Sequence, residues 1–221
     1  MQHQKAEIEW RESGVPVSKR FDDPYFSLEN GLAETRHVFL AGNDLPDRFF
    51  DGFCIAELGF GTGLNFLATL VEWEKAGAPG HLHYTGFEGF PMSPEEMTRA
   101  LSHYPELAEP VEALVAFWAG GSFSHPSVSL EIIGGDARES LAAWQGRADA
   151  WFLDGFSPAK NPELWQPELM AEVAAHTNPG GTAATYTAAG FVRRGLEAAG
   201  FDVTRAPGYG RKRHMTRAIL G

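Results

Sequence analysis

The chain has 221 residues, of which 43% are hydrophobic and 21% charged, and a formal net charge of −11. This length allows one α/β domain with a full core. No apolar run approaches the roughly 18 residues that cross a bilayer, and the start lacks a signal-peptide core, so we expect a cytoplasmic protein without membrane contact. The single cysteine excludes an internal disulfide, and without paired histidine spacing we expect no metal site.

The charge is unevenly distributed. From Gly190 to the C-terminus seven Lys or Arg residues accompany only two acids, so the rest of the chain is strongly acidic. The net acidity argues against general nucleic-acid binding. The basic segment suits either one phosphate-bearing substrate or the balancing of acidic neighbours in the fold, and the pattern alone leaves both open.

Residues 1–50 show no regular hydrophobic periodicity and are rich in turn-forming residues. They nevertheless carry too many large apolar residues for a disordered tail. We predict an ordered N-terminal extension that packs on a domain spanning residues 51–221. Short strands are expected around residues 24–27 and 37–40.

From residue 53 onward strands and helices alternate. The predicted strands span residues 53–58, 81–88, 128–133, 149–153, 182–186, 201–206 and 214–220, and the predicted helices span 62–75, 94–107, 111–118, 138–145, 162–176 and 188–199. Ser93 is expected to cap the second helix, with Pro94 at its first position. The alternation predicts an α/β fold: a mostly parallel sheet with helices on both faces and an antiparallel pair at the end.

A glycine-rich turn, residues 57–65, joins the first strand to the first helix. Its glycines permit positive φ and close approach of a ligand to the helix N-terminus. A dinucleotide fingerprint requires a small residue at position 64, so Leu64 disfavours a dehydrogenase. The G-x-G-x-G spacing after an acid resembles the first motif of class I S-adenosylmethionine-dependent methyltransferases, whose Rossmann-like sheet has seven strands. This resemblance implies cofactor binding by Glu57, Gly59, Phe60, Gly61, Thr62, Gly63 and Asn65.

Three further acids follow predicted strands. Glu88 is expected to accept hydrogen bonds from ribose hydroxyls. The resemblance to these methyltransferases implies that Asp136, with Ala137, contacts the adenine. Asp154 follows the strand 149–153 and enters a sharp loop, where ligands of open α/β sheets bind. Taken singly, Glu88 and Asp136 are better explained as solvated charges at strand ends, and Asp154 is equally well explained as a cap on a local turn. Their order along the chain predicts a methyl-donor site.

The loop from Asp154 to Trp165 resembles a signature of the methyltransferase domain family of the bifunctional tRNA 5-methylaminomethyl-2-thiouridine biosynthesis protein MnmC. Residues 16–18, 21–27, 31–40, 57–66, 187–196 and 210–215 extend the resemblance over nearly the whole chain. Members of this family are often fused to an FAD-dependent oxidoreductase. Since a second domain of that size does not fit within 221 residues, we expect a stand-alone, MnmD-like chain.

The resemblance implies a tRNA methyltransferase that uses S-adenosylmethionine to methylate the 5-aminomethyl group of wobble uridine 34, giving 5-methylaminomethyl(-2-thio)uridine. The expected partners are the tRNA anticodon loop and a separate FAD-dependent oxidoreductase, and we expect the chain to be a monomer. Arg211, Lys212 and Arg213 are expected to contact the RNA.

The acceptor amine constrains the role of Asp154. An alkyl amine has a pKa of about 10, so an ordinary carboxylate with a pKa near 4 is about six units too weak to hold its proton. Asp154 is therefore expected to orient the amine and stabilise the cation that forms.

Four further residues have two possible roles each. Phe156 would stack on the uracil or belong to the core, and Lys160 would reach a phosphate or solvent. Tyr25 and Phe26 would form a lid or pack internally.

Two other functions remain open at this stage. One keeps the cofactor and replaces the RNA with a small amine metabolite, which the net charge favours. The other is a non-catalytic partner that binds S-adenosylmethionine and docks on a separate oxidoreductase.

Overall fold

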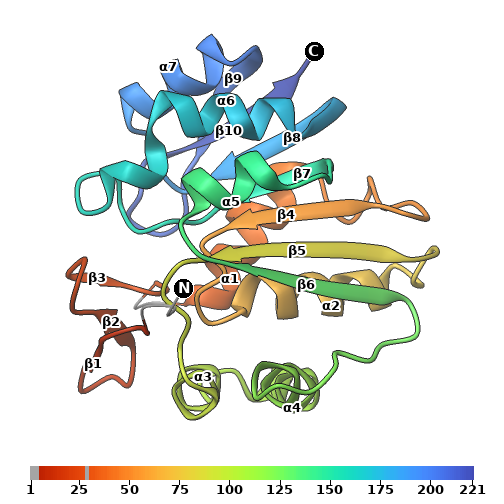
Figure 1. Cartoon of the computed structure of the whole chain (residues 1–221), viewed down its shortest axis with the longest axis vertical. Coiled ribbons are helices and arrows are strands. Elements are labelled where there is room, and N and C mark those ends of the chain that lie inside the picture. Colours follow the sequence, from red (N-terminus) through yellow and green to blue (C-terminus); the bar gives the residue numbers. More distant parts are fainter. Residues whose placement is uncertain (1–4, 28–29) are drawn as a thin grey trace.

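The computed structural model describes residues 5–27 and 30–221. A seven-stranded sheet with the order β6-β5-β4-β7-β8-β10-β9 forms its centre (Figure 1). Its strands are β4 (Cys54–Leu58), β5 (Leu82–Glu88), β6 (Val128–Gly134), β7 (Ala148–Leu153), β8 (Thr177–Thr185), β9 (Phe201–Pro207) and β10 (His214–Leu220). β10 is antiparallel to β8 and β9, whereas the other neighbours pair in parallel. The predicted α/β fold with an antiparallel last strand is confirmed.

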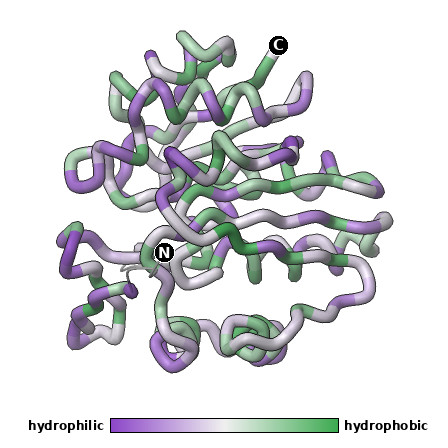
Figure 2. The backbone as a smooth tube through the Cα atoms, in the orientation of Figure 1, coloured by the Kyte–Doolittle hydropathy of each residue, from purple (hydrophilic) through white to green (hydrophobic). Residues whose placement is uncertain are grey.

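Helices cover both faces of the sheet because the buried strand residues alternate between two apolar clusters. In β4, Ile55 packs in one cluster and Ala56 and Leu58 in the other. The first cluster takes in α1 (Gly31–Thr35), α2 (Leu64–Lys75), α3 (Pro94–Leu101) and α4 (Ala108–Trp118), and the second takes in α5 (Ala137–Ala143), α6 (Pro167–Ala175) and α7 (Gly190–Ala198). Figure 2 shows hydrophobic residues along the central strands, between these layers.

Two predicted helices are each interrupted at a proline, which cannot donate a backbone hydrogen bond within a helix. The segment 94–107 divides into α3 and the 3₁₀ helix η3 (Pro105–Leu107), and the segment 162–176 into η4 (Pro162–Trp165) and α6. The start of α3 follows the prediction. Ser93 accepts a hydrogen bond from the backbone of Glu96, and the Glu96 carboxylate accepts one from the backbone of Ser93, which completes a capping box.

The strand predicted for residues 37–40 is wrong. These residues lie in the π-helix η1 (Arg36–Leu40), which continues α1 and leads into η2 (Ala41–Asn43). Asn30 starts this helical stretch by accepting a hydrogen bond from the Ala33 N–H at 2.9 Å. The run of three buried apolar residues, Val38 to Leu40, was typical of a strand, but η1 packs between α2 and β8 and so buries consecutive side chains.

The N-terminal segment forms a small antiparallel sheet, β1 (Ile8–Trp10), β2 (Pro16–Ser18) and β3 (Asp23–Pro24), so the strand predicted for residues 24–27 stops at Pro24. Figure 1 shows this sheet beside the carboxyl ends of β4 to β6. The Ser157 N–H donates to Asp23 Oδ2 at 2.7 Å, and Lys160 forms an ion pair with Asp22. These contacts attach the segment to the loop that follows β7. The domain boundary at residue 50 remains a prediction.

No helix within residues 5–27 and 30–221 is long and apolar enough to cross a membrane.

Candidate active site

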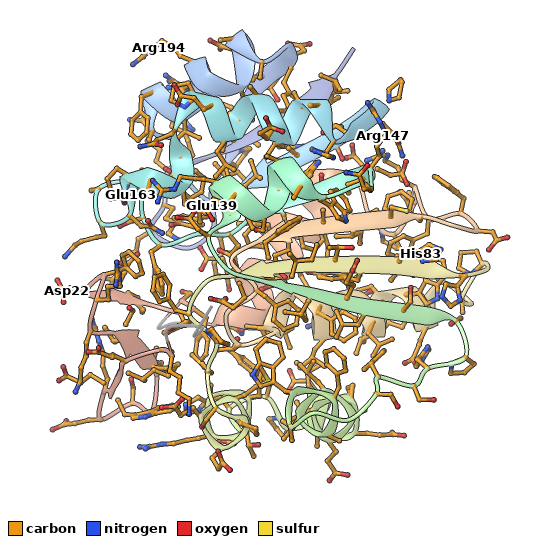
Figure 3. All side chains as sticks on the ribbon, in the orientation of Figure 1. Asp22, His83, Glu139, Arg147, Glu163 and Arg194 are labelled. Atoms are coloured by element: carbon orange, nitrogen blue, oxygen red, sulfur yellow. The ribbon has the colours of Figure 1, made fainter. Side chains whose placement is uncertain are left out.

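A cavity of about 1260 Å³ opens at the carboxyl edge of the sheet. Its wall takes residues from the turns after five successive strands in the chain: Gly59, Gly89, Gly135, Gly155 and Tyr186. Figure 3 shows Asp22, Glu139 and Glu163 at this edge, and His83 and Arg147 at the opposite edge. The cavity therefore lies where ligands bind in open α/β sheets.

Most residues predicted to form the site line this one cavity. These are Tyr25, Phe26, Gly59, Phe60, Gly61, Thr62, Asn65, Glu88, Asp136, Ala137, Asp154, Phe156, Lys160, Arg211 and Lys212. Three predicted residues, Glu57, Gly63 and Arg213, are not part of the wall. Glu57 is fully buried. Gly63 has a φ of +78°, which strains any other residue, and a Cβ there would lie 2.6 Å from the Leu114 side chain. Arg213 is exposed on the loop between β9 and β10.

The turn after β4 needs glycine for two separate reasons. Gly59 has a φ of +86°, and a Cβ there would lie 2.3 Å from the carbonyl oxygen of Asp154. The Asp154 N–H in turn donates to the Leu58 carbonyl at 3.0 Å. The glycine-rich turn and the Asp154 loop are thus in backbone contact.

The substitution Gly59→Ala is expected to abolish binding of S-adenosylmethionine and to lower the free energy of unfolding by roughly 2 kcal/mol or more, because it adds a backbone clash to the strain of positive φ. Gly77 is a matched control, since its φ is +84° and no atom lies within 4 Å of its added Cβ. Gly77→Ala should cost only about 1 kcal/mol and leave cofactor binding intact. Chemical denaturation and calorimetric titration measure both effects, and equal losses in the two variants would contradict the assigned role of the turn.

Glu88 fixes the turn from the end of β5. Its two carboxylate oxygens accept hydrogen bonds from the N–H groups of Gly61 at 2.7 Å and Phe90 at 2.6 Å. Burial raises its pKa, although these hydrogen bonds oppose the shift. Each oxygen keeps a second acceptor position, so the carboxylate can still accept from a pair of neighbouring hydroxyl groups.

Asp136 caps α5 and is already engaged. Its Oδ1 accepts from the Arg138 N–H at 3.0 Å, and the Arg138 guanidinium holds the pKa of the carboxyl below its usual range. A contact between Asp136 and an adenine amino group would therefore share the carboxylate with Arg138.

Asn65 connects two acids next to the turn, the buried Glu57 and the half-buried Asp154. Its Nδ2 donates to Asp154 Oδ2 at 2.7 Å and to Glu57 Oε1 at 2.6 Å, while its Oδ1 accepts from the Thr35 hydroxyl at 2.7 Å. Glu57 also accepts from the Tyr84 hydroxyl at 2.8 Å. These three hydrogen bonds use both N–H donors and the oxygen of the Asn65 amide, and they fix this side chain beside the Asp154 carboxylate.

Burial raises the pKa of Asp154 to about 7, with the Asn65 hydrogen bond opposing the shift, the Glu34 charge adding to it and Lys212 lowering it. The pKa of Asp154 is therefore about three units below that of an alkyl amine, rather than about six. Asp154 remains the weaker base, so the expected role in orienting the amine is retained. Burial also raises the pKa of Glu57 well above its usual range.

The predicted aromatic residues have partners within the protein. Phe156 stacks on Phe21 with ring centres 4.8 Å apart and forms a T-shaped pair with Tyr25 at 5.0 Å. Phe26 packs edge-on to Tyr104, and Phe60 stacks on Trp118 at 5.4 Å. Since Phe21 covers one face of Phe156 and Tyr25 also packs on the ring, a flat ligand would contact only the part that these two residues leave open.

Among the wall residues that sequence reasoning missed are Glu34, Tyr186 and Tyr209. Tyr186 directly follows β8, so the rule that selected Asp154 at a strand end could have found it. Glu34 belongs to a short helix in the N-terminal segment, which carries no such signal. Among the described residues, no group of three or more His, Cys, Asp or Glu side chains is arranged to hold a metal ion.

A Rossmann-like sheet with a glycine turn and strand-end acids around one cavity defines a nucleotide-type ligand site. Residues 105–221 match the family model described as S-adenosyl-L-methionine-dependent methyltransferase, and the chain belongs to this family. Its cofactor is S-adenosylmethionine.

The chain is similar to two curated proteins named tRNA 5-methylaminomethyl-2-thiouridine biosynthesis bifunctional protein MnmC. It is 48% identical to the one from Caulobacter vibrioides, over 95% of this chain and 37% of the relative, and 47% identical to the one from Stutzerimonas stutzeri, over 98% and 35%. The chain thus spans little more than a third of the length of these relatives. The crystal structure of MNMC2 from Aquifex aeolicus has a TM-score of 0.77 and 27% identity, covering 99% of this chain and 72% of that one.

The residues present fit the cofactor. The glycine turn leaves the space that a Cβ would fill, and Glu88 offers acceptors for the ribose hydroxyls of S-adenosylmethionine. Asp136 and Ala137 line the same cavity one strand further along the sheet.

Proposed function

We propose that this chain transfers a methyl group from S-adenosylmethionine to the 5-aminomethyl nitrogen of wobble uridine 34 in tRNA, giving the 5-methylaminomethyl form. The observation that carries the proposal is the position of Asp154, held by Asn65 in the wall of the cofactor cavity. The names of the MnmC relatives support the RNA substrate. We further propose a cytoplasmic monomer that receives its aminomethyl substrate through a separate FAD-dependent oxidoreductase.

The chain contributes alignment to this reaction. S-adenosylmethionine, when bound, would supply the methyl group on a sulfonium, and S-adenosylhomocysteine would remain as the by-product. Asp154 accepts a hydrogen bond from the neutral amine, points the nitrogen lone pair along the line of attack and stabilises the positive charge that forms on nitrogen. The amine loses its proton to solvent before it attacks the methyl carbon, because Asp154, with a pKa of about 7, is a weaker base than the amine and does not hold the proton.

The RNA would present an already unpaired base. Extruding a single-stranded wobble uridine costs little, so it can enter the cavity without disrupting a duplex. Phe156 would contact the uracil with the part of its ring that Phe21 and Tyr25 do not cover. The cationic wall residues Arg138, Lys160 and Lys212 are paired with acids, so contact with RNA phosphates would require exchange of those partners.

The pH dependence follows from Asp154. The group must be ionised to accept from the amine and to stabilise the cation, so kcat/KM for the RNA should rise as pH increases through about 7. In Asp154→Asn this inflection should disappear, leaving only the rise that follows deprotonation of the amine. Initial rates between pH 5.5 and 9 test this, and an unchanged profile in the variant would exclude Asp154 as the titrating group.

Methyl-transfer assays with three acceptors test which substrate the chain uses. An anticodon stem-loop with 5-aminomethyluridine at position 34 should take label from methyl-labelled S-adenosylmethionine, whereas the same loop with uridine and a simple alkyl amine should not. The net charge of −11 favours the small-amine alternative. That alternative would be supported if the free amine were methylated as well as the stem-loop. Cofactor binding without transfer to any acceptor would instead support a non-catalytic partner.

A further inference from the structure

An ion pair outside the cofactor turn faces the same cavity. Lys212 Nζ, from the loop between β9 and β10, lies 2.7 Å from Glu34 Oε1 and 4.2 Å from the centre of the Tyr186 ring. Glu34 comes from α1 and Tyr186 follows β8, so the cluster joins three distant parts of the chain. All three residues line the cavity, as Asp154 does.

The cluster has the chemistry of a site for an alkylammonium group. A carboxylate and an aromatic face are the two surfaces that such a cation prefers, through a charge-assisted hydrogen bond and a cation–π contact. The lysine side chain ends in a primary alkylammonium. The acceptor proposed above ends in the same group when protonated, so Lys212 has the contacts that the substrate would need.

Glu34 also lies close enough to Asp154 to interact with it electrostatically, as does Lys212. The Tyr186 hydroxyl donates to the carbonyl of Gly155 at 2.7 Å, which attaches the ring to the Asp154 loop. A cation held by Glu34 and Tyr186 would therefore be adjacent to the carboxylate that orients the nucleophile.

We infer that Glu34 and Tyr186 bind the aminomethyl group of the acceptor while it is still protonated, before it loses its proton and attacks, and that Lys212 occupies this place until the substrate displaces it. The inference rests on the proposed function. It assigns Glu34 as a substrate-binding residue and Lys212 as an internal competitor.

The exposure of the two partners fits displacement of the lysine. The Glu34 side chain is 12% exposed, so it stays in the wall, whereas that of Lys212 is 46% exposed. The loop backbone is held by hydrogen bonds from Lys212 N–H to the Tyr209 carbonyl and from Gly208 N–H to the Arg213 carbonyl. Only the Lys212 side chain needs to move, by changing rotamer toward solvent.

Equilibrium binding of nucleosides tests the inference without relying on methyl transfer. The probes are 5-aminomethyluridine and 5-hydroxymethyluridine, measured by calorimetric titration with the intact chain in the presence of S-adenosylhomocysteine. Glu34→Gln should weaken binding of the amino nucleoside about tenfold, because a charge-assisted hydrogen bond is lost, and leave the hydroxymethyl nucleoside unchanged. Lys212→Met, which keeps the apolar stem, should strengthen binding of the amino nucleoside by roughly two- to fivefold.

A surface pair gives the matched control. Lys75 lies 2.9 Å from Glu72 on α2, and neither residue lines the cavity. Lys75→Met should leave both affinities unchanged. If Glu34→Gln binds the amino nucleoside as wild type does, or Lys212→Met binds it more weakly, the inference is overturned.

Failure of the proposed function gives a different result. If the wild-type chain transfers no methyl group to the stem-loop bearing 5-aminomethyluridine, but the nucleoside affinities change in Glu34→Gln and Lys212→Met as expected, the alkylammonium site stands and the RNA reaction does not. If the stem-loop is methylated and neither affinity changes, the reaction stands and the role of Glu34 is overturned.

Discussion

Replacing Asp154 by asparagine is expected to lower kcat/KM for methyl transfer on the order of 10²- to 10³-fold while binding of S-adenosylmethionine persists. The amide keeps the size of the side chain but has no charge to stabilise the cation that forms on nitrogen. Steady-state kinetics with the aminomethyl stem-loop and calorimetric titration with the cofactor measure the two effects. Asp202→Asn, an exposed position in β9, is the control and should change neither.

The same substitution should stabilise the protein above neutral pH. The pKa of Asp154 is raised from 3.8 to about 7 in the folded chain, so the unfolded chain loses this proton first and stability falls as pH rises from about 4 to 7. Asparagine does not ionise, so the variant does not lose stability in this pH range. We expect Asp154→Asn to raise the free energy of unfolding by roughly 2 kcal/mol at pH 8 and to leave it unchanged at pH 4. The gain is smaller than the full pKa shift implies, because the carboxylate borders a water-filled cavity.

Denaturant unfolding at the two pH values checks this prediction. A variant that is less stable than wild type at pH 8 would mean that the ionised carboxylate stabilises the fold. A gain in stability together with the loss of methyl transfer would show that burial of the acid serves the reaction at a cost to the fold.

Replacing Asn65 by leucine is expected to have the largest effect on stability. It leaves Asp154 and Glu57 without their shared donor in a buried site, which should lower the free energy of unfolding by roughly 3 kcal/mol. Because Asp154 is then no longer held by a hydrogen bond from Asn65, kcat should also fall, with little change in KM for the cofactor. Denaturant unfolding and steady-state kinetics measure these effects.

A milder pair of variants keeps this prediction testable if Asn65→Leu does not fold. Thr35→Val removes only the hydroxyl that donates to the Asn65 side chain, and Thr69→Val removes a buried hydroxyl that donates to the Asn65 backbone carbonyl at 2.8 Å. Each should cost about 1 kcal/mol. Only Thr35→Val should lower kcat. Equal rates in the two variants would contradict the role of the Asn65 side chain in holding Asp154.

The sequence was sufficient for the parts of the fold with a clear local pattern. Alternating strands and helices predicted the sheet and its antiparallel end, and polar residues at strand ends located Glu88, Asp136 and Asp154 on one cavity wall. Parallel strands place their carboxyl ends at one edge, so this part of the site follows from the order of elements alone.

The parts that could not be predicted depend on packing between distant segments. Glu57 was expected to bind the cofactor, but its side chain is fully buried and its carboxylate accepts hydrogen bonds from Asn65 and Tyr84. Glu34 reaches the cavity because α1 packs on α2. Lys212 forms an ion pair with Glu34 that the sequence did not indicate, and its contact with RNA stays a prediction. The ordinary pKa assumed for Asp154 was wrong because burial around the loop raises it.

The most direct test of the proposed reaction uses tRNA isolated from cells that lack this activity. The purified chain is given methyl-labelled S-adenosylmethionine, with Asp154→Ala in parallel, and the tRNA is digested for nucleoside mass analysis. We predict label on 5-methylaminomethyluridine with the wild-type chain and none with the variant, although both bind the cofactor. Label on another nucleoside, or no label from a wild-type chain that binds the cofactor, would contradict the assignment of wobble uridine as the acceptor.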